Sequence, residues 1–219
     1  MDHLAKAEEF NKKAIKKSNP NFLEKIFSYS VKWEVADLFA KSGSHYKMAK
    51  EYQLAGKAYK NAYNYNNEIN HLEKAAECYK NYDKNKSTKL YRKIAQIYIE
   101  EGIFTKAVYI YEKIANIFEK DNSIDLAIKY YKDAIKYLDT DNNQSYKKYR
   151  LCIKLTKLYL KQKRYRDIYE LLYFLDISII YNKMYKLLAG ICYLADNLDT
   201  VGAKKLDIGE QQSIFDSII

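Results

Sequence analysis

The sequence has few of the residues that interrupt α-helices. Its 219 residues include one proline and six glycines, so few positions disfavour the interior of a helix. It has no long alternating apolar run bounded by Asn-Gly or Asp-Gly turns, which are the signals of strands and hairpins. No apolar run reaches the roughly 18 residues that a membrane-spanning helix requires. With 48% hydrophobic residues, the chain is expected to fold into helices around a substantial core.

Cysteine is scarce as well. There are three cysteines, an odd number, and they are widely spaced in apolar segments with a helical pattern, at Cys78, Cys152 and Cys192. This pattern argues against a disulfide framework and against a zinc site. Buried free thiols in a reducing compartment explain it better, and we therefore expect a cytoplasmic protein.

The motifs of catalysis and cofactor binding are missing. The glycines stand alone rather than in a phosphate-binding loop, and there is no G-x-S-x-G or H-E-x-x-H sequence. The histidines His3, His45 and His71 have no cysteine or carboxylate at the spacing of metal ligands. We therefore expect a protein that is not an enzyme, with no catalytic residue, no metal ligand and no cofactor.

Arginine is rare among the basic residues. Only four of the 38 are arginine, whereas lysine, tyrosine, asparagine and isoleucine are abundant. An AT-rich coding sequence favours the same residues, so the net charge of +10 is a weak functional signal. A positive surface nevertheless favours acidic partners, namely an acidic protein, an anionic lipid or a nucleic acid.

What the sequence does contain is a repeat. A small residue recurs at spacings of 19 or 20 positions, and an aromatic residue follows it three or four positions later. Such a pair lies on one face of a helix, where the alanine lets a neighbouring helix approach and the ring fills the space beside it. Two repeats make a helix hairpin of about 40 residues. The alanines are Ala36, Ala55, Ala75, Ala95, Ala115 and Ala134, and the aromatic residues are Phe39, Tyr59, Tyr79, Tyr98, Phe118 and Tyr137.

This repeat predicts an all-α fold, a right-handed superhelical solenoid of antiparallel helix hairpins of the tetratricopeptide-like kind. We expect residues 1–219 to form a single elongated domain, with an N-terminal helix and apolar segment at 1–31, hairpins at 32–176 and atypical helices at 177–219. Trp33, at the edge of the first repeat, is expected to be a packing residue. The expected helices are 3–17, 32–46, 49–64, 67–81, 86–101, 104–119, 123–138, 144–161, 165–175 and 180–195.

Two features are candidates for binding. The segment from Phe22 to Phe27 follows the helix break at Pro20 and is strongly apolar. It either caps the first hairpin or inserts into a bilayer interface, where nearby lysines meet anionic headgroups. The second feature is a set of basic residues on helix surfaces, which form either a solvated face or an electropositive surface for an acidic helical partner. This set is Lys60, Lys80, Lys106, Lys113, Arg150, Lys154 and Lys157.

Four stretches of the chain occur in an order typical of one known family. They are Phe22-Leu23-x-x-Ile26-Phe27, then Tyr46-Lys47-Met48-Ala49-Lys50-Glu51-Tyr52 leading into Ala55-Gly56-x-Ala58-Tyr59, then Gly102-Ile103-Phe104-Thr105-Lys106-Ala107, then Asp125-x-Ala127-Ile128-x-Tyr130-Tyr131. In this order the chain resembles the soluble NSF attachment proteins, the alpha/beta/gamma-SNAP family. Each motif is short, but the helix order and spacing agree over roughly residues 4–195.

The resemblance implies an adaptor. Proteins of this family wrap the SNARE four-helix complex that remains after membrane fusion and recruit the hexameric ATPase NSF, which unwinds it. Their loop between the first two helices touches the membrane, and Phe22, Leu23, Ile26 and Phe27 match it. The resemblance thus implies a cytoplasmic protein peripherally associated with membranes. Its implied partners are SNARE complexes, an NSF-type ATPase and the membrane surface, and not nucleic acid.

The basic positions through which the family contacts SNARE complexes are matched in part. Lys80 and Arg150 occupy two of them, whereas Ile103 and Tyr109 stand at two others. Lys106 lies on the same predicted helix as Tyr109 and is a candidate substitute. The predicted SNARE-binding residues are Lys80, Lys106, Arg150 and Lys154.

Family members continue beyond the region that matches 185–219, into a helical bundle that engages NSF. We therefore expect SNARE and membrane binding to be better supported than stimulation of NSF. Two other functions stay open at this point. One is a generic helical-repeat scaffold that binds a peptide or protein tail, and the other is a basic solenoid that holds RNA, which the aromatic residues at core spacing disfavour.

Overall fold

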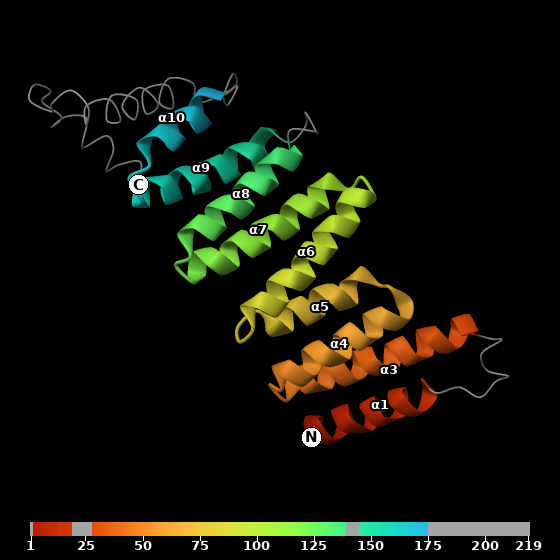
Figure 1. Ribbon diagram of the computed structural model, residues 1–219. Helices are drawn as coiled ribbons and strands as arrows, with labels where there is room; N and C mark the ends of the chain where they lie inside the picture. The colour runs from red at the N-terminus through yellow and green to blue at the C-terminus, as the bar shows by residue number, and fades with distance from the viewer. Residues whose placement is uncertain (1, 19–27, 139–144, 175–219) are drawn as a thin grey trace, which may run out of the picture. The chain divides into compact units, whose positions relative to one another are not determined.

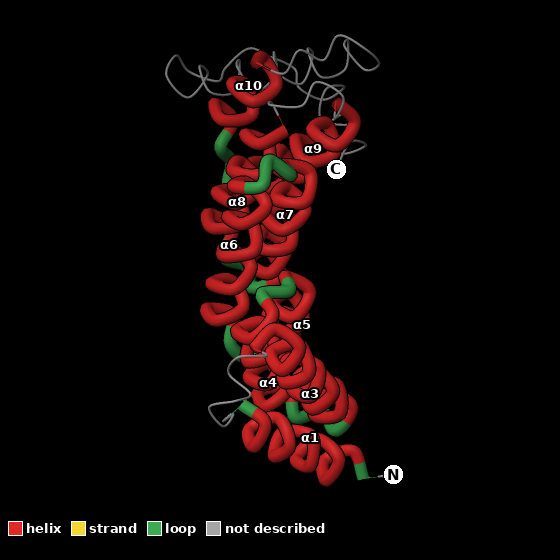
Figure 2. Tube along the Cα trace, turned by 90° about the vertical axis from the view of Figure 1, so that its right-hand side faces the viewer, coloured by secondary structure: helices red, strands yellow, loops and turns green. Residues whose placement is uncertain are grey.

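The computed structural model describes residues 2–18, 28–138 and 145–174, and within these ranges every regular element is a helix (Figures 1 and 2). The chain divides into two compact units, Met1–Ser123 and Ile124–Ile219. The apolar segment Phe22–Phe27 and the predicted helix 180–195 lie outside the described residues.

The first unit is a stack of helices in which each helix packs on the next along the chain (Figure 1). Short turns join α3 to α4, α4 to α5, α5 to α6 and α6 to α7, so these neighbours run antiparallel. This is the helix-hairpin solenoid that the repeat predicts. The helices are α1 (His3–Lys17), α3 (Ser28–Met48), α4 (Tyr52–Asn66), α5 (Ile69–Tyr79), α6 (Lys84–Glu100) and α7 (Phe104–Lys120).

The second unit is also built of helices. It contains α8 (Ile124–Leu138), α9 (Ser145–Lys161) and α10 (Tyr165–Phe174). Helix α9 packs against α8 and against α10. The turn between α9 and α10 places Lys163 at a φ of 55°, in the left-handed region that ends a helix.

The turns of the first unit have clear chemical causes. The left-handed region is occupied by Gly102 at a φ of 72°, Asn67 at 56° and Lys50 at 63°. Glycine has no Cβ to clash there and asparagine tolerates the conformation. Lys50 explains why α4 begins at Tyr52 and not at the predicted residue 49. At the start of α6, the Asp83 carboxylate accepts a hydrogen bond from the Lys86 backbone N–H at 2.9 Å, which is an ordinary N-cap.

The repeated alanines lie in the core, as predicted. Ala36, Ala55, Ala75, Ala95, Ala115 and Ala134 are all 0% exposed. The aromatic half of the prediction holds for Phe39, Tyr59 and Tyr79, which are buried, but is wrong for Tyr98, Phe118 and Tyr137, which are half-buried. In α6 and α8 the fully buried rings belong to Tyr91 and Tyr131, which precede the repeat alanine instead of following it.

Two glycines allow a tyrosine ring to approach the backbone of the preceding helix closely. A Cβ on Gly56 would meet the Tyr79 ring at 2.7 Å, and a Cβ on Gly43 would meet the Tyr59 ring at 3.1 Å. The repeat tyrosines of α4 and α5 therefore lie directly against the backbone of the preceding helix. This contact is a tighter version of the alanine–aromatic pairing that the sequence predicts.

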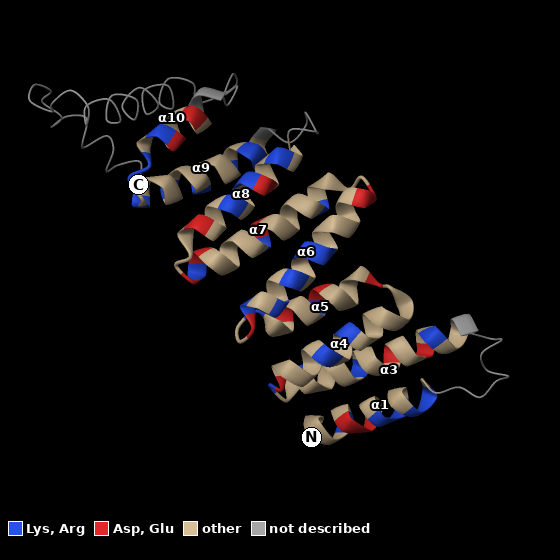
Figure 3. Ribbon diagram, in the orientation of Figure 1, with Lys and Arg blue, Asp and Glu red and all other residues tan. Residues whose placement is uncertain are grey.

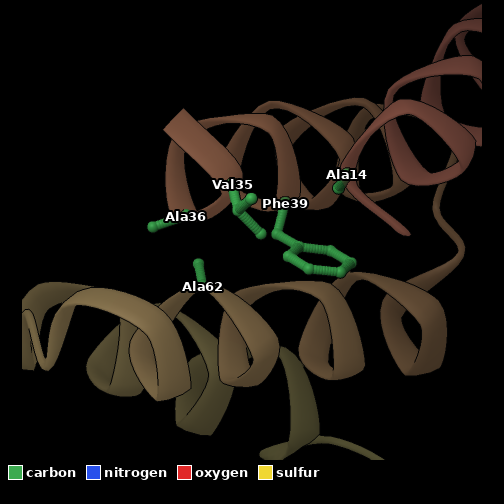
Figure 4. Close-up of a cluster of buried hydrophobic side chains, with 5 residues drawn as sticks. All are labelled: Ala14, Val35, Ala36, Phe39 and Ala62. Carbon is green, nitrogen blue, oxygen red and sulfur yellow. The ribbon is translucent and has the colours of Figure 1, made fainter. Parts of the chain in front are cut away.

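The first helix packs on α3 through small side chains (Figure 4). A buried cluster joins Ala14 of α1 to residues of α3 and α4, namely Val35, Ala36, Phe39 and Ala62. The Ser42 hydroxyl donates a buried hydrogen bond of 2.9 Å to the Ala7 carbonyl. Trp33, which the sequence predicts to be a packing residue, is 40% exposed.

Candidate partner-binding surface

A network of charged and aromatic side chains links α5, α6 and α7 in the first unit. The Lys113 ammonium lies 2.6 Å from the Glu73 carboxylate and 4.7 Å from the centre of the Tyr109 ring. The Tyr91 hydroxyl donates a 2.7 Å hydrogen bond to Glu77. The three helices are therefore tied together by polar contacts as well as by their apolar core.

Electrostatics inside this network favour its ionised form. Burial raises the pKa of Glu77, but hydrogen bonds from Lys80 and Tyr91 outweigh it and bring the pKa below its ordinary value. Burial lowers the pKa of Lys113, and its contacts with Glu73 and Tyr109 reverse that effect. Each charge is thus held by a neighbour of opposite sign or by a ring.

Two of the predicted binding residues lie in this unit. Lys80 caps the end of α5 and pairs with Glu77 at 2.8 Å. Lys106 is exposed on α7, with its ammonium 5.3 Å from the centre of the Tyr98 ring. Tyr109, which stands at a basic position of the resembled family, is exposed on the same helix. The charge of Lys80 is therefore partly neutralised by a carboxylate, and the ammonium of Lys106 lies against an aromatic ring.

The other two predicted residues lie on α9 in the second unit. Arg150 is exposed and Lys154 is half-buried, one turn further along the same face. The Lys154 ammonium lies 5.6 Å from the centre of the Tyr131 ring on α8. In the opposite direction, Lys132 of α8 lies 5.8 Å from the Tyr159 ring on α9.

Helix α9 carries a stripe of positive charge, which we call the α9 stripe. The helix contains six basic residues and no acidic residue. Figure 3 shows blue basic segments on α9. Five of them recur at alternating steps of three and four residues, which places them on one face. At 1.5 Å per residue the stripe is about 21 Å long. Its members are Lys147, Arg150, Lys154, Lys157 and Lys161.

The comparisons with known proteins assign the family. The family model described as "Soluble NSF attachment protein, SNAP" matches residues 5–215. The chain belongs to the soluble NSF attachment protein family. No curated protein matches the chain.

Solved structures with similar folds are distant from this SNAP-family chain. BtubC (BKLC) from P. vanneervenii has 13% identity and a TM-score of 0.49, over 100% of this chain and 90% of that one. The protein pilF of Pseudomonas aeruginosa has 14% identity and a TM-score of 0.42, over 97% of this chain and 99% of that one.

The structure describes the borders of the predicted membrane segment of this SNAP-family chain. Ile15 is 50% exposed and Trp33 is 40% exposed, on the two helices that precede and follow it. Lys16, Lys17 and Lys32 are exposed nearby in the sequence, and Lys17 forms an ion pair with Glu34. The four predicted membrane-contact residues themselves lie outside the described part of the chain.

Other chemistry is limited within the described ranges. There, no group of three or more His, Cys, Asp or Glu side chains is arranged to hold a metal ion. None of the helices in the same ranges is long and apolar enough to cross a membrane. Cys78 and Cys152 are buried free thiols, as predicted, and burial raises the pKa of Cys78.

The lysine–tyrosine pairs were not anticipated from the sequence. The sequence shows 24 tyrosines and many lysines. Which ring lies near which ammonium can be predicted only when the packing register of the helices is known. The expectation that His71 has no carboxylate near it at ligand spacing is wrong, because its Nε2 lies 2.8 Å from the Glu68 carboxylate, three residues earlier in the chain. Three members of the α9 stripe, Arg150, Lys154 and Lys157, are among the basic residues that the sequence predicts for binding, and the same spacing extends the stripe to Lys147 and Lys161.

Proposed function

We propose that this SNAP-family chain is an adaptor in vesicle-mediated transport. It binds assembled SNARE complexes at membranes and recruits an NSF-type hexameric ATPase for their disassembly. It acts by binding and not by catalysis, as a cytoplasmic protein held peripherally at membranes. The observation that carries the proposal is the family match over residues 5–215, and the α9 stripe supports it.

The α9 stripe suits an elongated acidic partner. Its alternating steps of three and four residues are the steps at which a facing helix presents its own side chains. A SNARE complex is a bundle of long helices with an acidic surface, so charges along one helix can meet charges along another. Such contacts fix orientation and speed of encounter more than they fix sequence, which suits an adaptor that serves different SNARE complexes.

Membrane contact is proposed for Phe22, Leu23, Ile26 and Phe27. The exposed Ile15 and Trp33 and the bordering lysines support it, because apolar side chains beside basic ones favour an anionic bilayer interface. In liposome flotation, replacing Phe22 and Phe27 by serine should release the chain from anionic vesicles. Flotation equal to that of the parent chain would rule out this part of the proposal.

The main test uses a SNARE complex assembled beforehand and immobilised. The double variant Arg150→Glu with Lys154→Glu should bind at least about tenfold more weakly than the parent chain, since four units of charge change on one face. The control is Lys129→Glu with Lys136→Glu, which makes the same change of charge at exposed positions of α8 and should bind more tightly than the α9 variant.

The same assay separates the alternatives. Binding of the assembled complex over separate SNARE chains, followed by ATPase capture, supports the adaptor. If the parent chain binds no complex and instead captures an extended peptide, the generic helical-repeat scaffold replaces it. Binding should also weaken with salt, because exposed charge pairs are screened beyond about 10 Å at 0.1 M ionic strength.

A further inference from the structure

Two histidines that are far apart in the sequence meet between the first two described helices. His3 lies in the first turn of α1 and His45 near the end of α3, 42 residues later. Their Nδ1 atoms are 3.2 Å apart, and both side chains are partly exposed to solvent. The Phe10 ring stacks on His45 at a centroid distance of 5.6 Å and an interplanar angle of 12°, which restricts the orientation of that imidazole.

The two nitrogens point toward each other. The ring centres are 5.5 Å apart, which is the Nδ1–Nδ1 distance plus roughly one ring diameter, so both Nδ1 atoms lie between the ring centres. In the metal-free chain this contact is a hydrogen bond in which one imidazole donates its Nδ1–H and the other accepts. Two nitrogen lone pairs are therefore available at one point when the hydrogen moves to the outer nitrogen of the donor ring.

The spacing fits a pair of metal ligands. A tetrahedral zinc ion with Zn–N bonds of about 2.0–2.1 Å holds two ligand nitrogens about 3.3–3.4 Å apart. The observed 3.2 Å is close to that value. The terminal torsion of a histidine side chain is soft, so a small rotation of each ring turns both lone pairs toward a shared ion. Both side chains are partly exposed to solvent, so water can complete the coordination.

We propose that His3 and His45 form a two-histidine site for a divalent transition metal such as Zn²⁺. Binding needs both imidazoles neutral with their hydrogens on Nε2, which is a change of tautomer without net loss of a proton. The site takes imidazole-seeking metals and not Mg²⁺ or Ca²⁺, which prefer oxygen ligands. The carboxylate of Asp2, one residue before His3, adds negative charge nearby.

The position of the site gives it a mechanical role. Helix α1 packs mainly on α3, through the Ala14 cluster and the Ser42–Ala7 hydrogen bond. The ion pair of Lys17 with Glu34 joins the end of α1 to the beginning of α3. A metal ion on His3 and His45 joins the beginning of α1 to the end of α3. Together with the Lys17–Glu34 ion pair, it holds α1 against α3 at both ends.

The test is a zinc titration of the chain without a polyhistidine tag, read by isothermal calorimetry and by the thermal midpoint. One Zn²⁺ per chain should bind and raise the Tm. His3→Ala and His45→Ala should each weaken binding more than about tenfold, since each removes one of two ligands. Phe10→Leu is the control, because it alters the neighbouring ring and keeps both imidazoles.

Two further measurements distinguish a loss of zinc binding from a loss of folding. His3→Gln keeps a polar side chain in the first turn of α1, so it should fold like the parent chain and still lose zinc. Hydrogen exchange in α1 should slow on adding zinc to the parent chain and stay unchanged in His3→Gln. Absence of binding below about 1 mM zinc, or binding that His3→Gln and His45→Ala leave intact, would overturn the proposal.

Discussion

Replacing Gly56 with alanine tests whether close contact between a tyrosine ring and a helix backbone holds the solenoid together. A Cβ at this position would meet the Tyr79 ring at 2.7 Å, well inside normal carbon–carbon separation. The ring has little freedom to move aside, because Tyr79 is buried and packs edge-on against Tyr82 at a centroid distance of 5.6 Å. The substitution should therefore force α4 and α5 apart.

Two opposing effects decide the size of the change. Overpacking a core costs about 1–3 kcal/mol, whereas exchanging glycine for alanine in a helix contributes about 1 kcal/mol of stability. We expect Gly56→Ala to lower the free energy of unfolding by roughly 1 kcal/mol. Gly43→Ala is the matched control, because its Cβ would meet the Tyr59 ring at 3.1 Å, a distance that a small shift relieves.

Urea unfolding followed by circular dichroism measures both variants. Gly56→Ala should lower the urea midpoint at an unchanged slope, and Gly43→Ala should leave it close to the parent value or raise it. If Gly56→Ala were as stable as Gly43→Ala, the ring–backbone contact would not limit the approach of α4 to α5, and the reasoning would fail.

Three further predictions concern single positions. Lys113→Met should lower stability by about 1 kcal/mol, because Glu73 loses its 2.6 Å partner at a mostly buried site; urea unfolding of Lys113→Met with Glu73→Gln should show a smaller loss than the two single changes combined. Asn67 at a φ of 56° should tolerate glycine, whereas alanine should cost about 1 kcal/mol, as thermal unfolding would show. Burial lowers the pKa of His71, although Glu68 opposes this, so unfolding takes up a proton; stability should fall as pH drops below the ordinary imidazole pKa of about 6.5. This part of the pH profile should flatten in His71→Asn, and an unchanged profile would assign it to other groups.

The core was predictable from the sequence because it depends on spacing. The six repeat alanines are buried as expected, since a helix fixes which residues share a face. The half-buried positions of Tyr98 and Tyr137 were not predictable, because α6 and α8 also contain Tyr91 and Tyr131 at competing positions and only packing decides which ring is buried. The His3–His45 contact was not predictable for a related reason. It depends on how far α1 is shifted along α3 in their antiparallel packing, and nothing in the two local sequences fixes that shift.

The candidate surface shows that net charge describes this chain poorly. In the first unit, neighbouring groups interact with the charge of several lysines. Lys80 is paired with Glu77, Lys113 is paired with Glu73, and Lys106 lies over a tyrosine ring. Helix α9, by contrast, contains six basic residues and no acidic residue. Because a dense run of basic side chains on one face attracts an acidic partner at a distance, we expect the α9 stripe to guide such a partner more strongly than the lysines that alternate with carboxylates in the first unit. We therefore propose that binding of an acidic partner depends more on the arrangement of charge along α9 than on the net charge of the whole sequence.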